Sequence, residues 1–76
     1  MFKYQIRIDT ATDVKEIVEI AETLPYNIHI ENENGVKRGN AKTLLNVIDA
    51  MTYRKVYILC DHDIYTPFNK FIMNES

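Results

Sequence analysis

The sequence contains little of several residue types on which small folds often depend. A single cysteine, Cys60, cannot form an intramolecular disulfide, so the fold is not expected to need an oxidising compartment. Only two glycines and two prolines occur in 76 residues, which argues against a linker or a disordered tail. The longest apolar run, Val56 to Cys60, is far too short to cross a membrane. We therefore expect one domain that spans residues 1–76.

An excess of charge of one sign is also missing. Nine Lys and Arg residues stand against eleven Asp and Glu residues, and the net charge is −2. Basic residues cluster only as the pairs Lys37-Arg38 and Arg54-Lys55. Nucleic-acid binding normally requires a basic stripe, so neither a nucleic-acid partner nor a membrane partner is predicted. No basic leader precedes the first alternating segment, and cytoplasm is the expected location.

The first half of the chain shows clear periodic patterns. Apolar residues alternate with polar ones over residues 2–9, which predicts a strand with one buried face. Thr10 and Thr12 are candidate N-caps, and Asp13 is an early acid, for a helix that ends before Pro25. The apolar residues of this helix recur at helical spacing: Val14, Ile17, Val18, Ala21 and Leu24. A strand and a helix are therefore predicted in succession.

A hairpin is predicted next. A second strand runs from about Tyr26 to Glu31, and Asn34-Gly35 is a strong turn signal because both residues tolerate positive φ. The return strand, Val36 to Arg38, is short and polar, and Gly39 is expected to end it.

A second helix, a last strand and a final helix complete the predicted order. Asn40 is the predicted N-cap of a helix whose apolar residues cover more than one stripe: Ala41, Leu44, Leu45, Val47, Ile48 and Met51. The strand from Arg54 to Asp61 directs Val56, Ile58 and Cys60 to the core and Tyr57 and Leu59 to the opposite face. Residues 63–74 predict a short helix that begins near Thr66-Pro67. The order β-α-β-β-α-β-α indicates an α+β fold, with an antiparallel or mixed sheet and helices on one face.

This order of elements and the amino-acid sequence of residues 34–51 resemble HPr, the histidine-containing phosphocarrier family of the bacterial sugar phosphotransferase system. HPr chains carry a similar Asn-Gly hairpin, a short polar strand and a helix that opens with Ala or Leu, then Lys-Ser. Here the helix opens Asn40-Ala41-Lys42-Thr43-Leu44-Leu45. The resemblance implies an open-faced β-sandwich with a four-stranded antiparallel sheet and helices packed on one face.

The loop that carries catalysis in that family differs in this chain. The family signature is Gly-Ile/Leu-His-Ala-Arg-Pro between the first strand and the first helix. The corresponding loop, Asp9 to Asp13, contains no His and no Arg, and the two histidines, His29 and His62, fall elsewhere. The resemblance therefore implies an HPr-like interaction or regulatory module that is not an enzyme, lacks phosphocarrier activity at the family histidine and needs no cofactor.

The same resemblance suggests where partners bind. Leu44, Leu45 and Ile48 match positions at which the second helix of HPr meets partner proteins, so a protein that binds HPr is an expected partner. The residues Tyr57 and Leu59 form a second candidate apolar patch, for docking or for a homodimer.

Two other chemistries are considered. Thr43 stands where the family has a regulatory serine, which predicts either a phosphorylation switch or an ordinary first-turn residue. Cys60 and His62 would be a nucleophile and its base in a small enzyme, but a cysteine on the inward face of a strand is usually inert. Asp61, His62 and Asp63 lack the spaced second half of a metal site, and no metal is predicted.

Overall fold

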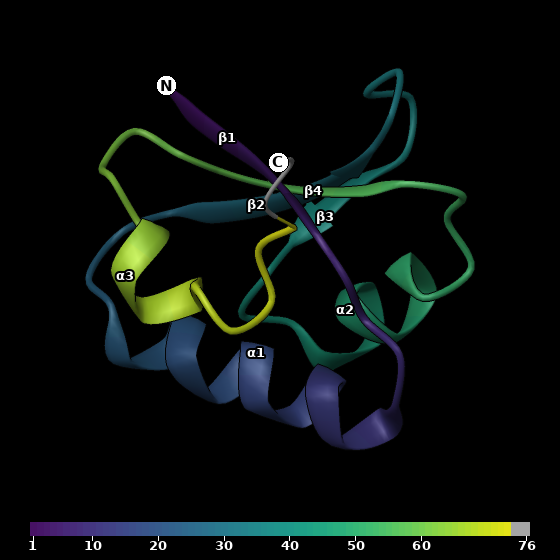
Figure 1. Cartoon of the computed structure of the whole chain (residues 1–76), viewed down its shortest axis with the longest axis horizontal. Helices are drawn as coiled ribbons and strands as arrows, with labels where there is room; N and C mark the ends of the chain where they lie inside the picture. Colours follow the sequence, from purple (N-terminus) through teal and green to yellow (C-terminus); the bar gives the residue numbers. More distant parts are fainter. Residues whose placement is uncertain (74–76) are drawn as a thin grey trace.

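Within residues 1–73, which the computed structural model describes, four strands form one antiparallel sheet in the order β1-β4-β2-β3. The helices lie on one face of this sheet and leave the other face open (Figure 1). The elements in chain order are β1 Phe2–Ile6, α1 Ala11–Thr23, β2 Ile28–Asn32, β3 Arg38–Asn40, α2 Leu44–Ala50, β4 Val56–Cys60 and α3 Tyr65–Phe68. The predicted α+β class, element order and four-stranded antiparallel sheet are confirmed.

β4 is an inner strand that pairs with both β1 and β2. Ile58 lies opposite Tyr4 on one side and Ile30 on the other. Because side chains alternate along a strand, Val56, Ile58 and Cys60 enter the core as predicted. The largest fully buried side chains come from helices, strands and the loop after β4: Phe68, Ile17, Ile28, Ile30, Ile58, Ile64, Val14 and Val47.

α1 is the longest helix that the structure describes, and its ends are defined as the sequence predicts. Thr10 is the N-cap: its side chain accepts a hydrogen bond from the backbone N–H of Asp13, and the Asp13 carboxylate bonds back to the cap. Leu24 leaves the helix in an extended conformation just before Pro25. The helix buries Val14, Ile17, Val18 and Ala21 against the sheet.

The return strand and the start of α2 differ from prediction. β3 comprises Arg38–Asn40, so Gly39 lies within the strand, opposite Ile30. Asn40 is not a helix cap, because its side-chain oxygen accepts a hydrogen bond from the backbone N–H of Lys42 at 2.9 Å and forms a local turn. α2 begins at Leu44, later than predicted.

Gly39 has a packing role that its place in the sequence does not reveal. A Cβ built on Gly39 would lie 2.7 Å from the Cβ of Asn46 in α2. The glycine therefore permits the close approach of β3 and α2.

The helix-free face of the sheet does not present the predicted apolar patch. Leu59 is only 6% exposed, and its cross-strand neighbours are Lys3 and His29. Tyr57 is half-buried, with the Lys3 ammonium 4.7 Å from its ring centroid. Glu31 is buried on this face, with Lys3 3.5 Å and Arg38 3.8 Å from its carboxylate oxygens. Of the two residues predicted for a docking patch, Leu59 is therefore buried and Tyr57 is half-buried, so they expose little apolar area, and docking at this face stays a prediction.

The last described residues pair with β1 instead of continuing a helix. α3 ends at Phe68, and an antiparallel bridge joins Ile72 to Ile6. The backbone N–H of Arg7 donates to Phe71 at 2.8 Å, and that of Met73 donates to Gln5 at 2.9 Å. The predicted helix over residues 63–74 is therefore too long, and its last residue, Asn74, lies outside the described residues. No helix within residues 1–73 is long and apolar enough to span a membrane.

Candidate functional site

α2 has apolar residues on two sides, and only one side is buried. Val47 and Ala50 are fully buried in the core. Leu44, Leu45 and Ile48 are 48%, 74% and 44% exposed. A helix of only seven residues thus leaves three large apolar side chains in contact with water.

Two of these side chains help to line a groove between α1 and α2, which we call the apolar groove. Its volume is about 420 Å³, and its lining residues are Ala11, Val14, Lys15, Leu44, Ile48 and Met51. The structure therefore brings Leu44 and Ile48 together, whereas Leu45 is not among the lining residues. Sequence reasoning missed the α1 wall, because helical spacing indicates only that Val14 faces the core and gives no sign that it also borders α2.

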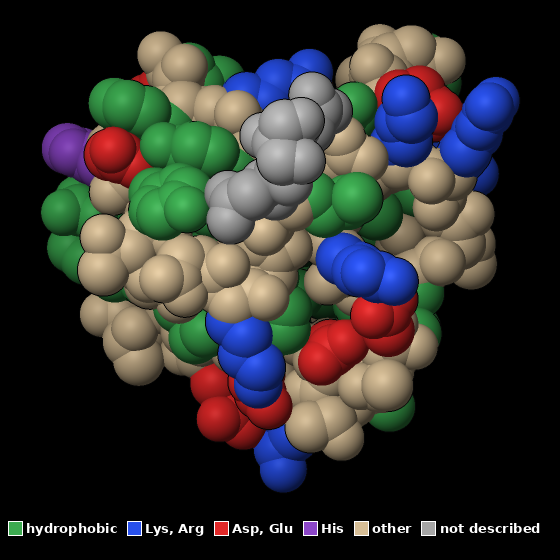
Figure 2. Space-filling view, viewed as in Figure 1, with side chains coloured by type: hydrophobic (Ala, Val, Ile, Leu, Met, Phe, Trp, Pro, Cys, Tyr) green, Lys and Arg blue, Asp and Glu red, His purple; other side chains and the backbone are tan. Residues whose placement is uncertain are grey.

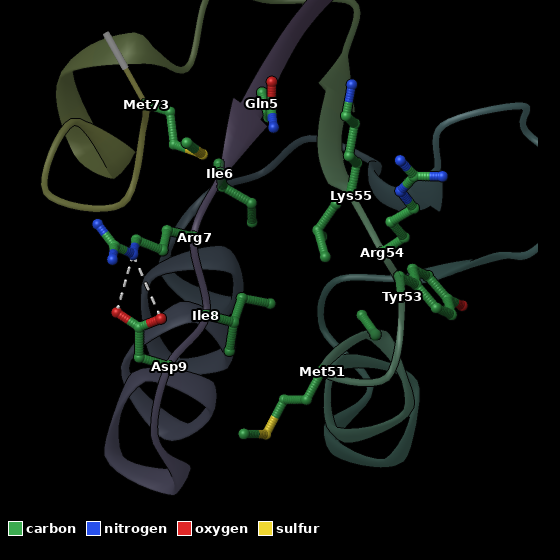
Figure 3. A pocket seen from close by; sticks show the side chains of 12 residues that line it. Gln5, Ile6, Arg7, Ile8, Asp9, Met51, Tyr53, Arg54, Lys55 and Met73 are labelled. Atoms are coloured by element: carbon green, nitrogen blue, oxygen red, sulfur yellow. Dashed lines mark hydrogen bonds and ion pairs between the residues drawn. The ribbon is translucent and has the colours of Figure 1, made fainter.

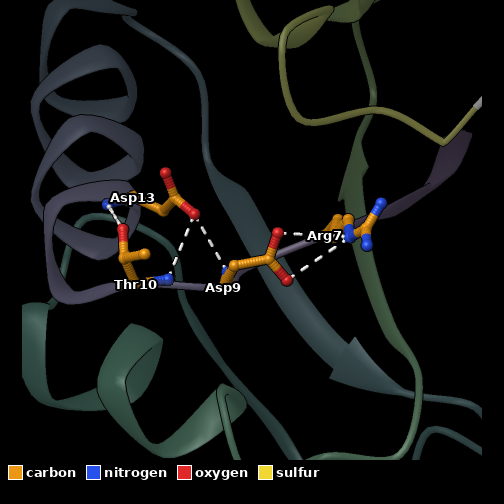
Figure 4. Close-up of polar contacts among 4 residues, drawn as sticks. All are labelled: Arg7, Asp9, Thr10 and Asp13. Carbon is orange, nitrogen blue, oxygen red and sulfur yellow. Dashed lines mark hydrogen bonds and ion pairs between the residues drawn. The ribbon is translucent and has the colours of Figure 1, made fainter.

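The loop from β1 to α1 lies near one end of α1 and is closed by its own side chains (Figure 4). The Arg7 guanidinium contacts the Asp9 carboxylate at 3.2 Å. The Asp13 carboxylate accepts hydrogen bonds from the backbone N–H groups of Asp9 at 2.9 Å and Thr10 at 3.2 Å. These bonds lower the pKa of Asp13 below its usual value, and the bond from the Asp9 N–H has the largest effect. A carboxylate of the chain itself therefore occupies the anion position at the α1 N-terminus.

Comparisons with known proteins identify the architecture. No protein-family model matches the chain, and no curated protein sequence matches it. The crystal structure of HPr-C-His from Thermoanaerobacter tengcongensis superposes with a TM-score of 0.65, over 83% of this chain and 76% of that chain, at 21% sequence identity. The fold is HPr-like. At this identity the likeness concerns the fold alone.

In this HPr-like fold, Thr43 is the N-cap of α2. The sequence predicts instead a residue inside the first turn of that helix. The backbone N–H groups of Asn46 and Val47 donate to the Thr43 carbonyl at 3.1 and 3.2 Å. The Thr43 side chain is exposed and makes no capping hydrogen bond. Its hydroxyl is therefore accessible at one end of α2, next to a residue of the apolar groove.

The two histidines lie away from the first loop of the HPr-like fold. His29 is on β2, opposite Asn40 and Leu59. His62 follows β4, and its ring stacks on Tyr26 with centroids 4.0 Å apart. Neither histidine is placed where the β1–α1 loop meets α1.

The predicted cysteine chemistry finds little geometric support. Cys60 is 1% exposed, and its sulfur accepts a hydrogen bond from the backbone N–H of His62 at 3.5 Å. The contact is thus with the backbone of His62, while its ring is stacked on Tyr26. Within residues 1–73, no group of three or more His, Cys, Asp or Glu side chains is arranged to hold a metal ion.

Proposed function

We propose that this chain is a non-catalytic, HPr-like protein-interaction module that binds a protein partner through the apolar groove and the exposed side of α2. The observation that carries the proposal is the position of Leu44 and Ile48, which are about half exposed and line one hollow with residues of α1. An apolar hollow on a polar surface is a common feature of protein docking sites.

The size of the exposed apolar surface favours a transient complex. Complete burial of a Leu or Ile side chain contributes about 1.5–3 kcal/mol. Leu44 and Ile48 are already about half buried, so each has roughly 1 kcal/mol left to gain from a partner. Together with Leu45, these residues support a weak, reversible association more than a permanent one.

The closed first loop supports a role without phosphate transfer at that place. Phosphate acceptance requires a nucleophile and free donors for the incoming anion. Residues 7–13 contain no histidine, and the N–H groups of Asp9 and Thr10 already bind Asp13. The charges of Asp9 and Asp13 also oppose the approach of an anionic phosphoryl donor.

The resemblance to HPr makes proteins that bind HPr the first partners to test. The purified chain is titrated with the phosphotransferase enzymes that bind HPr, and backbone amide shifts are followed by NMR. We expect shifts at Leu44 and Ile48, and the Leu44→Ser/Ile48→Ser double variant should bind at least about tenfold more weakly. Val36→Ser is the matched control, because Val36 is 79% exposed and is not a lining residue of the apolar groove.

Two results would contradict this proposal. One is the absence of shifts on α2 at a partner concentration of about 1 mM, which would detect even weak binding. The other is phosphate incorporation at His29 or His62 when the chain and authentic HPr receive the same phosphoryl donor.

A second candidate function is a phosphorylation switch at Thr43. It is favoured by one observation: the Thr43 hydroxyl is exposed and is not used as a cap, so modification would break no capping bond. A phosphate there would place about two negative charges beside Leu44 and would change what the apolar groove accepts. Incubation with an HPr-type serine kinase should add one phosphate to the parent and none to Thr43→Val. An unmodified mass, with authentic HPr phosphorylated in the same tube, would exclude this switch.

A further inference from the structure

A second hollow lies on the other side of Met51, and we call it the basic pocket. Its volume is about 340 Å³. One wall is formed by the end of β1 and the first loop, with Arg7, Ile8 and Asp9, and the other by the α2–β4 connection, with Arg54 and Lys55 (Figure 3). Residues far apart in the sequence thus form one hollow.

The apolar groove and the basic pocket are neighbours on one surface. Met51 lines both hollows. It is 38% exposed, so a molecule that fills one hollow and extends past this side chain reaches the other. A ligand of this surface therefore meets an apolar region and a charged region within a short distance.

The charge around the two hollows is opposite in sign to that of the chain as a whole. Their lining residues include four cations, Lys15, Arg7, Arg54 and Lys55, and one acid, Asp9, a net charge of +3. The whole chain carries −2, so the remaining residues together carry −5. The acids Asp13, which bonds to the Asp9 backbone, and Asp49, which acts on Tyr53, lie close by and reduce this excess, so the positive charge open to a negatively charged ligand is that of Arg54 and Lys55.

Two of the cations are free to meet such a ligand. Arg7 is already bound to Asp9, but neither Arg54 nor Lys55 forms an ion pair with another residue of 1–73. The ammonium of Lys37 lies 5.8 Å from the Tyr53 ring centroid and adds a further positive charge beside this wall. In the space-filling view, Lys and Arg side chains lie together with acidic side chains near the end of the β2–β3 hairpin (Figure 2).

We propose, building on the function proposed above, that the segment of the partner protein that binds this surface is an acidic amphipathic peptide. Its apolar side chains fill the apolar groove, and its carboxylates lie at Arg54 and Lys55. Since Met51 separates the hollows, the two kinds of side chain must lie within a few residues of each other, as they do at i and i+3 or i+4 of a helix. A hollow surface accepts the side chains of such a segment, whereas a flat membrane surface would leave the hollows unfilled.

Synthetic peptides of about twelve residues test this inference, because Leu and Glu at i, i+4 spacing can span both hollows. One peptide carries Leu and Glu, a second has Gln in place of each Glu, and a third has Lys in place of each Glu. We expect the Glu peptide to shift amide resonances of Leu44, Ile48 and Lys55, and to bind at least about tenfold tighter than the Gln peptide at low salt. The difference should shrink as the salt concentration rises.

Charge reversal locates the effect. Arg54→Glu and Lys55→Glu should each weaken binding of the Glu peptide severalfold and leave the Gln peptide unaffected. Lys70→Glu is the control, because it makes the same change of charge at a residue that lines neither hollow. An equal loss in the control would overturn the inference, since the effect would then reflect net charge alone.

Failure of this inference can be distinguished from failure of the proposed function. Equal binding of the Glu and Gln peptides would overturn the acidic partner but leave docking in the apolar groove intact. Binding of the Glu peptide that is insensitive to Leu44→Ser/Ile48→Ser would overturn both. Tighter binding to vesicles of phosphatidylserine and phosphatidylcholine than to any peptide would replace the acidic segment by a membrane surface.

Discussion

Substitution of Gly39 by alanine should disturb the contact between β3 and α2 that positions the apolar groove. The new methyl group would lie 2.7 Å from the Cβ of Asn46 and 2.8 Å from its Cγ. Carbon atoms prefer separations of about 3.5–4.0 Å, so β3 and α2 must separate by roughly 0.8 Å or more. The Asn46 Cβ cannot rotate away, because it is fixed to the helix backbone.

The cost follows from two opposing effects. Overpacking of this kind destabilises a protein by about 1–3 kcal/mol. Replacing glycine by alanine also stabilises the folded state by about 0.4–1 kcal/mol, because the unfolded chain has less conformational entropy to lose. We therefore expect Gly39→Ala to lower the free energy of unfolding by about 1–2 kcal/mol, a sizeable part of the ~4–11 kcal/mol typical of a chain of this length.

Urea unfolding followed by circular dichroism measures this difference, and a double-mutant cycle assigns it. Asn46→Gly removes the obstructing Cβ, so the cycle with Gly39→Ala should show a favourable coupling of about 1 kcal/mol. Asn46→Ala is the control, because it retains the Cβ and should restore much less. The inferred contact is refuted if the free energy of unfolding of Gly39→Ala lies within about 0.5 kcal/mol of the parent value and the amide resonances of α2 do not shift.

Three further predictions concern other parts of the fold. Leu59→Ala should lower the free energy of unfolding by about 2–3 kcal/mol because Leu59 is buried, whereas Leu45→Ala, at an exposed position, should change it by less than about 0.5 kcal/mol in the same urea assay. Asp13→Asn should destabilise the fold near neutral pH. Because folding lowers the pKa of Asp13, the stability that its carboxylate contributes is present above the unfolded-state pKa and disappears as the pH falls through the folded-state pKa. The melting temperatures of variant and parent should therefore converge in acid. Lys42→Met should lower the melting temperature, because it removes the hydrogen bond of 2.8 Å from the ammonium to the carbonyl of Leu24, and Lys42→Arg should recover part of the loss.

The order of elements follows from the sequence because it depends on local patterns. Alternation specifies β1 and β4, helical spacing specifies α1, and the Thr10 cap and Pro25 mark the ends of that helix. Asn34-Gly35 also marks a real turn, in which Gly35 adopts a φ of 72°. Each of these signals involves residues close in the chain and identifies its element, although β1 ends at Ile6, before the end of the predicted strand over residues 2–9.

The errors at Gly39 and Leu59 arose where contacts between distant residues decide the structure, and the error at Asn40 arose from a local ambiguity. The sequence predicts a strand end at Gly39, because the residue that requires a glycine there, Asn46, lies in another element. The sequence predicts a helix cap at Asn40, because an asparagine that forms a local turn cannot be distinguished from a cap in a sequence. Alternation placed Leu59 on the helix-free face, but it carries no information about Lys3 and His29, which flank that side chain.

The candidate site was predicted in part for the same reason. The excess of apolar residues in one short helix indicates that some of them stay exposed, and the resemblance to HPr is what singles out Leu44 and Ile48 among them. The basic pocket could not be found, because Arg7 and the pair Arg54-Lys55 come to line one hollow only when β1 and β4 are paired. A composition with a net charge of −2 conceals such a local excess of positive charge.

The pairing of residues 71–73 with β1 has a consequence for how the chain folds during synthesis. β1 is made first, yet one of its neighbours in the sheet is β4 and the other is the segment that contains Ile72. The first strand must therefore wait, with its apolar side chains unburied, until almost all of the described chain has left the ribosome. Contacts so distant in sequence slow folding. During this interval β1 is the segment that most needs to be shielded, either by chaperones or by a highly soluble fusion partner.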